Sequence, residues 1–425
     1  MQPKRRWLVL VIFYGFILLH QSDKLLIGPL TTPIIQEFGI TQAQMGAVSS
    51  FAIVVSAVLY PIWGYLYDRY ARPRLLALAS FIWGATTWLN ALAPTYRAFL
   101  VTRASTGIDD SSYPGIHSLL SDYFGPRIRG KVFGALDTAM PFGYMLGLIL
   151  ATTLGASLGW RKVFLLTGAV GVVLSVLILL FVRDLPRGHA EPEMQGLEQV
   201  PTFHFDWRVA KQALKNPSIR LVFAQGFFGV FPWNVLTYWF FRYLETERGF
   251  TSGQATTTMM IAVVALACGY FVGGSIGDAL FHRTPRGRVI TAMSGVLLGV
   301  VFLVSALNIP IGNTLIFTVL MGLTGITMSM AAPNVLATVQ DITEPEVRST
   351  TLALLSLVEN AGAALSPWLA GLIADHSSLR VAILGICVVT WLLCALFFGL
   401  LARVVPADIQ RFRRTMRERA TLAHG

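Results

Sequence analysis

The chain has 425 residues, of which 54% are hydrophobic and 13% are charged, and its formal net charge is +11. Soluble domains carry about 25% charged residues, and a soluble protein this apolar would expose large hydrophobic patches to water. The composition therefore excludes a soluble enzyme, a secreted disulfide-rich scaffold and a disordered chain. It favours a membrane protein whose positive charge lies in loops over a protein that binds nucleic acid.

Apolar segments long enough to cross a bilayer as helices, about 20 residues each, recur along the whole chain. They are too long for the strands of a barrel and lack the alternation of polar and apolar residues that such strands show. The twelve expected spans are 7–33, 43–66, 74–93, 98–122, 131–155, 162–182, 218–242, 254–277, 288–307, 313–336, 348–372 and 379–403. We therefore expect an all-α membrane protein with twelve transmembrane helices.

The Lys and Arg residues test this topology, because cytoplasmic loops carry an excess of them. With the N-terminus in the cytoplasm, 25 of the 33 Lys and Arg residues fall on the cytoplasmic side and 6 on the opposite side. A missed span would invert the loops that follow it and remove this asymmetry. We expect an integral, multi-pass protein of a bacterial inner membrane, with both termini in the cytoplasm.

A polar segment with four prolines and mixed charges, residues 183–217, separates six spans from six. We expect an N-terminal six-helix bundle at 1–182 and a cytoplasmic linker at 183–217. A C-terminal six-helix bundle follows at 218–403, and then a basic cytoplasmic tail at 404–425.

The two halves repeat one another in sequence. Three features recur 210 or 219 positions later: Gly64 and Asp68 as Gly274 and Asp278, Arg129 as Arg348, and Arg161 as Arg380. Three matches in register with the span count indicate an internal duplication. Pseudo-symmetric six-helix halves are typical of transporters, in which the substrate site lies where the halves meet.

The segment Gly64-Tyr-Leu-Tyr-Asp68-Arg69-Tyr-Ala-Arg72-Pro-Arg74 resembles the loop between helices 2 and 3 of the major facilitator superfamily. Residues 274–288 resemble the degenerate second copy of that loop, and Arg103-x-x-x-Gly107 resembles the helix 4 motif. The resemblance implies that family's fold and secondary active transport by alternating access. It also implies a gating role for Gly64, Asp68, Arg69, Arg72, Gly274 and Asp278.

Within the superfamily, residues 107–113 and 348–375 resemble the Spinster-like transporters. Three positions depart from that pattern: Asp109 replaces a Gly, Asp110 replaces a Glu, and Ala363 replaces an acidic residue. Residues 113–115 and 159–161 equally resemble the organic anion:cation symporters. The resemblance implies a small organic anion or an amphiphilic, lipid-like solute such as a lysophospholipid.

Charged residues inside apolar spans are costly, so they usually pair or line a polar cavity. Arg103, Asp110 and His117 are seven residues apart and share one face of a continuous helix, whereas Asp109 points about 120° away, toward a neighbouring helix or lipid headgroups. A buried carboxylate beside an arginine can gain and release a proton as its surroundings change. We expect Asp23, Asp110 and Arg103 to couple transport to protons. The alternative is a static ion pair that holds the fourth helix in place.

Residues of several spans are expected to line the substrate cavity. Glu359 and Asn360 lie near the middle of the eleventh span with no nearby cation in the sequence, and Asn234 and Tyr238 share one face of the seventh. The full expected set is Arg103, His117, Asn234, Tyr238, Glu359 and Asn360. Aromatic residues at this spacing are equally consistent with packing in the membrane.

No nucleotide-binding P-loop and no cluster of Cys and His is present in the sequence, so we expect no ATP-driven transport, no metal and no cofactor. We expect a protein that is not an enzyme and that is a monomer. Its expected partners are a small-molecule or lipid substrate, protons and membrane lipids. The remaining alternative is a non-transporting membrane sensor built on the same fold.

Overall fold

The computed structural model describes residues 3–110, 114–124, 126–185, 215–343 and 345–424, and within these residues it contains helices and no strand. Eleven segments of the described residues are long and apolar enough to cross a membrane. The predicted all-α membrane fold is therefore confirmed. Contacts within the chain divide it into two compact units, residues 1–203 and 204–425.

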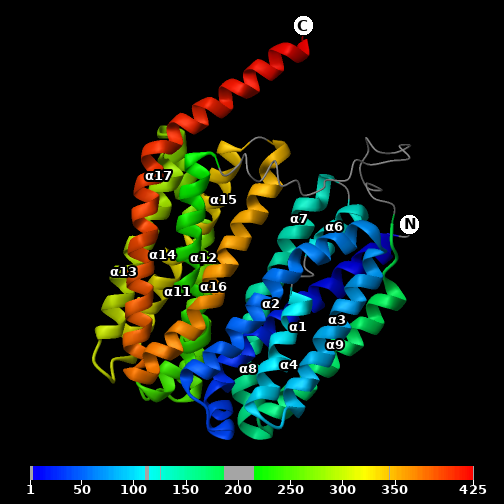
Figure 1. Cartoon of the computed structure of the whole chain (residues 1–425), viewed down its shortest axis with the longest axis vertical. Helices are drawn as coiled ribbons and strands as arrows, with labels where there is room; N and C mark the ends of the chain where they lie inside the picture. Colours follow the sequence, from blue (N-terminus) through cyan, green and yellow to red (C-terminus); the bar gives the residue numbers. More distant parts are fainter. Residues whose placement is uncertain (1–2, 111–113, 125, 186–214, 344, 425) are drawn as a thin grey trace. The chain divides into compact units, whose positions relative to one another are not determined.

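The first unit contains helices drawn in blue to green in Figure 1, with α3 packed along α9 and α1 along α8. Its helices are α1 (Pro3–Phe38), α2 (Gln42–Arg69), α3 (Arg72–Leu92), α4 (Tyr96–Ser105), α5 (Gly107–Asp110), α6 (Pro114–Tyr123), α7 (Pro126–Asp137), α8 (Ala139–Leu158) and α9 (Trp160–Phe181).

The second unit contains helices drawn in green to red, with α11 packed on α16 and α17 and with α12 packed on α14. Its helices are α11 (Pro217–Thr246), α12 (Ser252–Arg283), α13 (Gly287–Asn308), α14 (Thr314–Ser329), α15 (Ala331–Ile342), α16 (Pro345–His376) and α17 (Leu379–His424). The last helix continues through most of residues 404–425, which the sequence analysis assigns to a separate tail, and it projects beyond its neighbours in Figure 1.

The predicted span 98–122 is not one of the eleven continuous segments, because it is divided into α4, α5 and α6. Between α4 and α5, the hydroxyls of Ser105 and Thr106 donate to the carbonyls of Thr102 and Arg103, at 2.6 and 2.7 Å. Such side-chain bonds compete with the helical hydrogen bonds of the backbone. Pro114 is the first residue of α6, and the first turn of a helix tolerates a residue without a backbone N–H.

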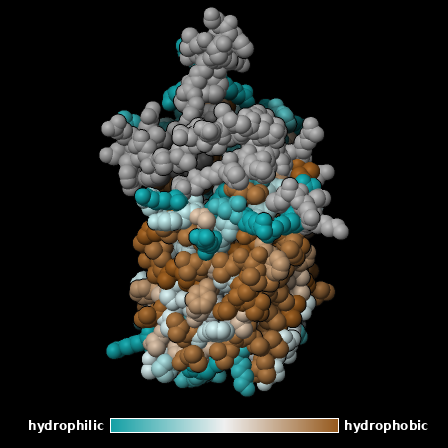
Figure 2. Space-filling model, turned by 90° about the vertical axis from the view of Figure 1, so that its right-hand side faces the viewer, coloured by the Kyte–Doolittle hydropathy of each residue, from teal (hydrophilic) through white to brown (hydrophobic). Residues whose placement is uncertain are grey.

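On the face of the molecule shown in Figure 2, hydrophobic side chains form a broad band with hydrophilic residues at its edges. Apolar side chains of α9 remain exposed, among them Leu166, Val173 and Leu180 at 48%, 57% and 66%. Such exposure suits a surface in contact with lipid rather than with water.

The duplication is visible in the packing of each unit. A Cβ atom added to Gly107 would lie 2.2 Å from the carbonyl oxygen of Ala52. A Cβ atom added to Gly325 would lie 2.9 Å from the carbonyl oxygen of Ala262, the residue 210 positions after Ala52. In both units, a glycine thus brings the fourth helix of the half against the backbone of the second.

The same repeat joins the first and sixth helices of each half. In the first unit, the carboxylate of Glu37 lies 2.8 Å from Arg161 and accepts a hydrogen bond of 2.5 Å from the Trp160 indole. In the second, Glu247, 210 positions later, accepts the backbone N–H groups of Leu379 and Arg380 at 2.6 and 3.0 Å. In each half, an acid near the end of the first helix therefore contacts the start of the sixth, through side chains in the first unit and through backbone N–H groups in the second. A negative charge at this end of a helix is also favoured by the helix dipole.

Candidate functional site

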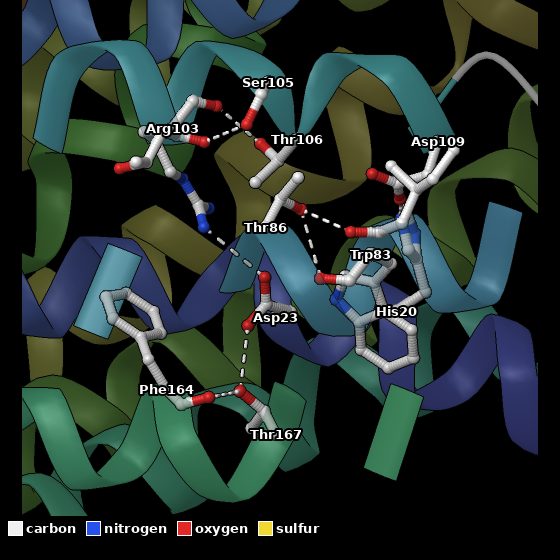
Figure 3. Close-up of polar contacts among 12 residues, drawn as sticks. His20, Asp23, Trp83, Thr86, Arg103, Ser105, Thr106, Asp109, Phe164 and Thr167 are labelled. Atoms are coloured by element: carbon white, nitrogen blue, oxygen red, sulfur yellow. Dashed lines mark hydrogen bonds and ion pairs between the residues drawn. The ribbon is translucent and has the colours of Figure 1, made fainter. Parts of the chain in front are cut away.

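Asp23 of α1 and Arg103 of α4 form an ion pair in the interior of the first unit (Figure 3). Arg103 Nη1 lies 3.4 Å from Asp23 Oδ2, and the hydroxyl of Thr167 donates to Asp23 Oδ1 at 3.2 Å. The two charged residues are only 4% and 7% exposed. The guanidinium carbon of Arg103 also lies 5.7 Å from the ring centre of Phe164, within the range of a cation–π contact.

This geometry compensates the charge of Asp23 by a cation from another helix. A charged pair in an apolar interior is held by its mutual attraction and its hydrogen bonds, and removing one partner leaves the other uncompensated.

A second buried contact lies beside the first. His20 Nε2 is 2.6 Å from Asp109 Oδ2, and the two side chains are 5% and 0% exposed. The His20 ring stacks on Phe16 and meets Trp83 edge-on, with centroid distances of 5.7 and 5.3 Å. Of the two surroundings expected for Asp109, a neighbouring helix or lipid headgroups, the structure shows the neighbouring helix, α1.

The sequence analysis did not identify the pair of His20 and Asp109. One signal was available, because His20 lies three residues before Asp23 and so on the same face of α1. Its partner could not be chosen from helical spacing, since α4 and α5 are separate helices.

Two further residues of the fourth span, Asp110 and His117, were expected in this region. The Asp110 side chain falls outside the described residues. His117 contacts α7 instead of α1: its Nε2 lies 3.5 Å from Asp137 Oδ1, and the two side chains are 40% and 68% exposed.

The expected gating residues of the first half have distinct surroundings. The side chains of Gly64 and Asp68 fall outside the described residues. Arg69 is exposed and donates to the Tyr65 hydroxyl at 2.6 Å. Arg72 is 3% exposed; its Nη1 lies 2.6 Å from Asp122 Oδ2.

Arg72 also connects α3 to the segment after α9. Its Nη2 donates to the carbonyl of Leu185 at 2.9 Å and lies 3.3 Å from Asp184 Oδ1. Arg72 therefore joins the start of α3 to α6 and to the segment that leads out of the first unit.

The second half has a related cluster around Arg288. Asp278, one of the expected gating residues, accepts a hydrogen bond from Arg288 Nη2 at 2.7 Å. Asp341 at the end of α15 also contacts this guanidinium. Asp341 lies 219 positions after Asp122, so the acid that meets an arginine recurs in both halves. At Gly274, an added Cβ would lie 3.8 Å from Pro333, an ordinary van der Waals distance.

A cavity of about 460 Å³ lies within the second unit, between α11, α12, α14, α15, α16 and α17. Glu359 lines it, whereas Asn234, Tyr238 and Asn360 do not. The amide of Asn234 donates to the Val230 carbonyl of its own helix at 2.9 Å, and Tyr238 is 4% exposed and packs on Trp239. Glu359 is thus the acid of this region that meets open space. No group of three or more His, Cys, Asp and Glu suited to a metal is found among the described residues.

The sequence profile of the Major Facilitator Superfamily matches residues 12–312 and 286–424 of this chain. Protein spinster of Drosophila melanogaster is 26% identical over 383 residues, which is 88% of this chain and 62% of the longer Drosophila protein. A probable sulfoacetate transporter of Cupriavidus necator is 26% identical over 294 residues, which cover 67% of this chain and 68% of that protein.

The fold is also similar to a solved structure. A bacterial homolog of the human lysosomal transporter Spinster, in an inward-facing and unoccupied conformation, superimposes with a TM-score of 0.84 at 20% identity. The superposition covers 96% of this chain and 99% of the other.

Proposed function

Because the chain belongs to the Major Facilitator Superfamily, a family of membrane transporters, we propose that it is a proton-coupled secondary active transporter for a small organic anion or an amphiphilic, lipid-like solute. The proposed coupling residues are Asp23, Asp110 and Arg103. The observation that carries the proposal is the buried contact between Asp23 and Arg103, which joins α1 to α4 by a pair of opposite charges.

The proposed mechanism follows from the chemistry of that contact. A proton on Asp23 removes its negative charge and frees Arg103, which can then meet the negative group of a solute. Loss of the proton restores the ion pair and displaces the solute. Alternating access, proposed here from the family, would convert this exchange into directional movement.

Two substrate classes remain in the proposal. The resemblance of residues 107–113 and 348–375 to the Spinster-like transporters implies a lipid-like solute such as a lysophospholipid. Similarity to the probable sulfoacetate transporter favours a small organic anion. We further propose a monomer in a bacterial inner membrane, with both termini and the 183–217 linker in the cytoplasm. The alternative, a sensor on the same fold, predicts binding without flux.

Reconstituted protein tests the proposal. Proteoliposomes that contain a pH-sensitive dye are given lysophosphatidylcholine or sulfoacetate, with and without an imposed pH gradient. We expect wild-type flux of one probe to follow the gradient, and Asp23→Asn and Asp110→Asn to lose that dependence. Asp137→Asn changes an exposed acid of the same unit and should behave as wild type. Flux that ignores the gradient in the wild type would refute proton coupling.

A further inference from the structure

The cavity of the second unit contains one acid and no basic side chain. Its lining includes Glu359 of α16, Gln225 and Trp233 of α11, Tyr270 of α12 and Ser329 of α14, together with mainly aliphatic residues. None of the lining residues is a Lys, Arg or His. These helices lie side by side in the second unit in Figure 1.

Glu359 has no ion pair and no hydrogen bond within the described part of the chain, where a cation within 4.0 Å would count as a pair. It lies against the backbone of α11, because a Cβ atom added to Gly226 would be 3.4 Å from its Oε1. A carboxylate inside a membrane protein is costly without a positive partner. The cavity thus offers a negative group for which the surrounding protein supplies no cation.

The polar groups near Glu359 are placed to accept hydrogen bonds. Gln225 donates through Nε2 to the Val222 carbonyl at 2.9 Å, and its Oε1 lies 3.7 Å from the Cys394 thiol. The Ser329 hydroxyl donates to the Leu266 carbonyl at 2.8 Å, which leaves its oxygen as an acceptor. The lining therefore has acceptors for the N–H or O–H groups of a ligand.

Two aromatic residues, Trp233 and Tyr270, complete this lining. The faces of such rings attract organic cations, and aromatic side chains are the usual surroundings of a bound quaternary ammonium. A volume of about 460 Å³ lies in the range of pockets for small organic molecules, about 300–1,000 Å³. A bare metal ion would need several oxygen ligands at close range, and Glu359 is the only carboxylate among the described lining residues.

Comparison of the halves strengthens this reading. Trp233 lies 210 positions after Asp23, and Val230 lies 210 positions after His20. Where the first half has acids compensated by Arg103 or His20, the second half has a tryptophan and open space. Glu359, the acid of this cavity, has no such partner among the described residues.

We infer that this cavity binds an organic ammonium group, held by Glu359 and by the faces of Trp233 and Tyr270. The inference rests on the proposed transport function and specifies its substrate as a solute that carries a positively charged nitrogen. A zwitterionic amphiphile meets this requirement, whereas a solute with negative charge alone does not.

The test uses the full chain in maltoside micelles, with calorimetry and Trp fluorescence as readouts. The probes are choline and its neutral isostere 3,3-dimethyl-1-butanol. We expect choline to bind at least about tenfold more tightly than the alcohol, a difference of about 1.4 kcal/mol, because only choline carries a charge that the partly buried Glu359 carboxylate can attract.

Glu359→Gln should abolish this preference, and Tyr270→Leu should weaken choline binding without changing the protein's charge. Asp375→Asn removes an exposed acid from the same helix and should leave binding unchanged. Retention of the preference for choline by Glu359→Gln would overturn the inference.

The flux experiment separates this inference from the proposed function. Wild-type flux that follows the pH gradient, combined with no choline binding, would refute the ammonium site alone. Choline binding that depends on Glu359, combined with no flux of any ammonium-bearing probe, would support the site and refute transport.

Discussion

His20 Nε2 and Asp109 Oδ2 lie 2.6 Å apart, and this contact joins α1 to α5 beside the ion pair that joins α1 to α4. His20 and Asp23 are separated by less than one helical turn, so a single stretch of α1 holds two partners from the divided fourth span (Figure 3). The first and fourth spans are therefore linked by two buried polar contacts.

The contact between His20 and Asp109 contributes to stability, and its loss should be measurable. Removing one partner of a buried pair costs about 3–5 kcal/mol, so Asp109→Ala should lower the apparent Tm in micelles clearly. The double variant His20→Phe with Asp109→Leu should recover much of that loss, because neither polar group is then buried alone.

Asp137→Ala is the matched control, since it breaks the exposed contact with His117 and exposed pairs contribute about 0–1 kcal/mol. Equal loss of Tm in Asp109→Ala and Asp137→Ala would show that the buried contact has no special role.

Hydropathy alone indicated the spans, because a run of apolar residues long enough to cross a bilayer has few alternative explanations. It also drew attention to Asp23, Arg103 and Glu359, since charges stand out in such runs. It could not indicate their partners. The pair of Asp109 with His20, and the acids Asp122 and Asp341 that meet Arg72 and Arg288, depend on where separate helices end and pack.

Arg103 is expected to require its guanidinium and not charge alone. It meets Asp23 at 3.4 Å and the face of Phe164 at 5.7 Å at the same time, and a lysine ammonium is a compact charge without a planar face. Arg103→Lys should therefore fold but lose most pH-driven flux in proteoliposomes. Arg161→Lys, at a partly exposed arginine that also meets an aromatic ring, is the control. Wild-type flux by Arg103→Lys would contradict this role.

The topology is expected to place both chain ends and the 183–217 linker on the cytoplasmic side. The distribution of Lys and Arg along the loops is the physical reason. Cysteines introduced at residues 2, 195 and 425 in a variant without the native cysteines should react with a membrane-impermeant maleimide only after the inner membrane is permeabilised. Labelling of residue 195 in intact spheroplasts would refute the two-bundle topology.

The two loop acids should differ in their effects on transport. Asp68→Asn is expected to impair flux while leaving solute binding within several-fold, because a gating residue shifts the balance of conformations without touching the solute. Asp278→Asn should have the smaller effect, since Arg288 keeps its contact with Asp341. Flux and equilibrium binding of the same probe provide the measurement, and complete loss of binding in a folded Asp68→Asn protein would contradict a gating role.

Gly107 and Gly325, the glycines at the repeated helix contact, can be tested by the same substitution in the two halves, so that each variant serves as a control for the other. A Cβ at Gly107 would lie 2.2 Å from the Ala52 carbonyl oxygen and 2.8 Å from the Ser56 nitrogen, both backbone atoms that cannot rotate away. At Gly325, the corresponding distances to Ala262 and Leu266 are 2.9 and 3.5 Å. Overpacking a close contact typically costs about 1–3 kcal/mol. Gly107→Ala should therefore lower the apparent Tm and flux strongly, and Gly325→Ala should do so less.

Gly134→Ala is the control for the substitution itself, because an added Cβ there meets no atom within 4 Å. In a helix, alanine is favoured over glycine by about 1 kcal/mol, so Gly134→Ala should match or exceed the wild-type Tm. The predicted order of Tm is Gly134→Ala, then Gly325→Ala, then Gly107→Ala. If Gly107→Ala were as stable as Gly134→Ala, the second and fourth spans of the first half could not approach as closely in the membrane as they do in this structure.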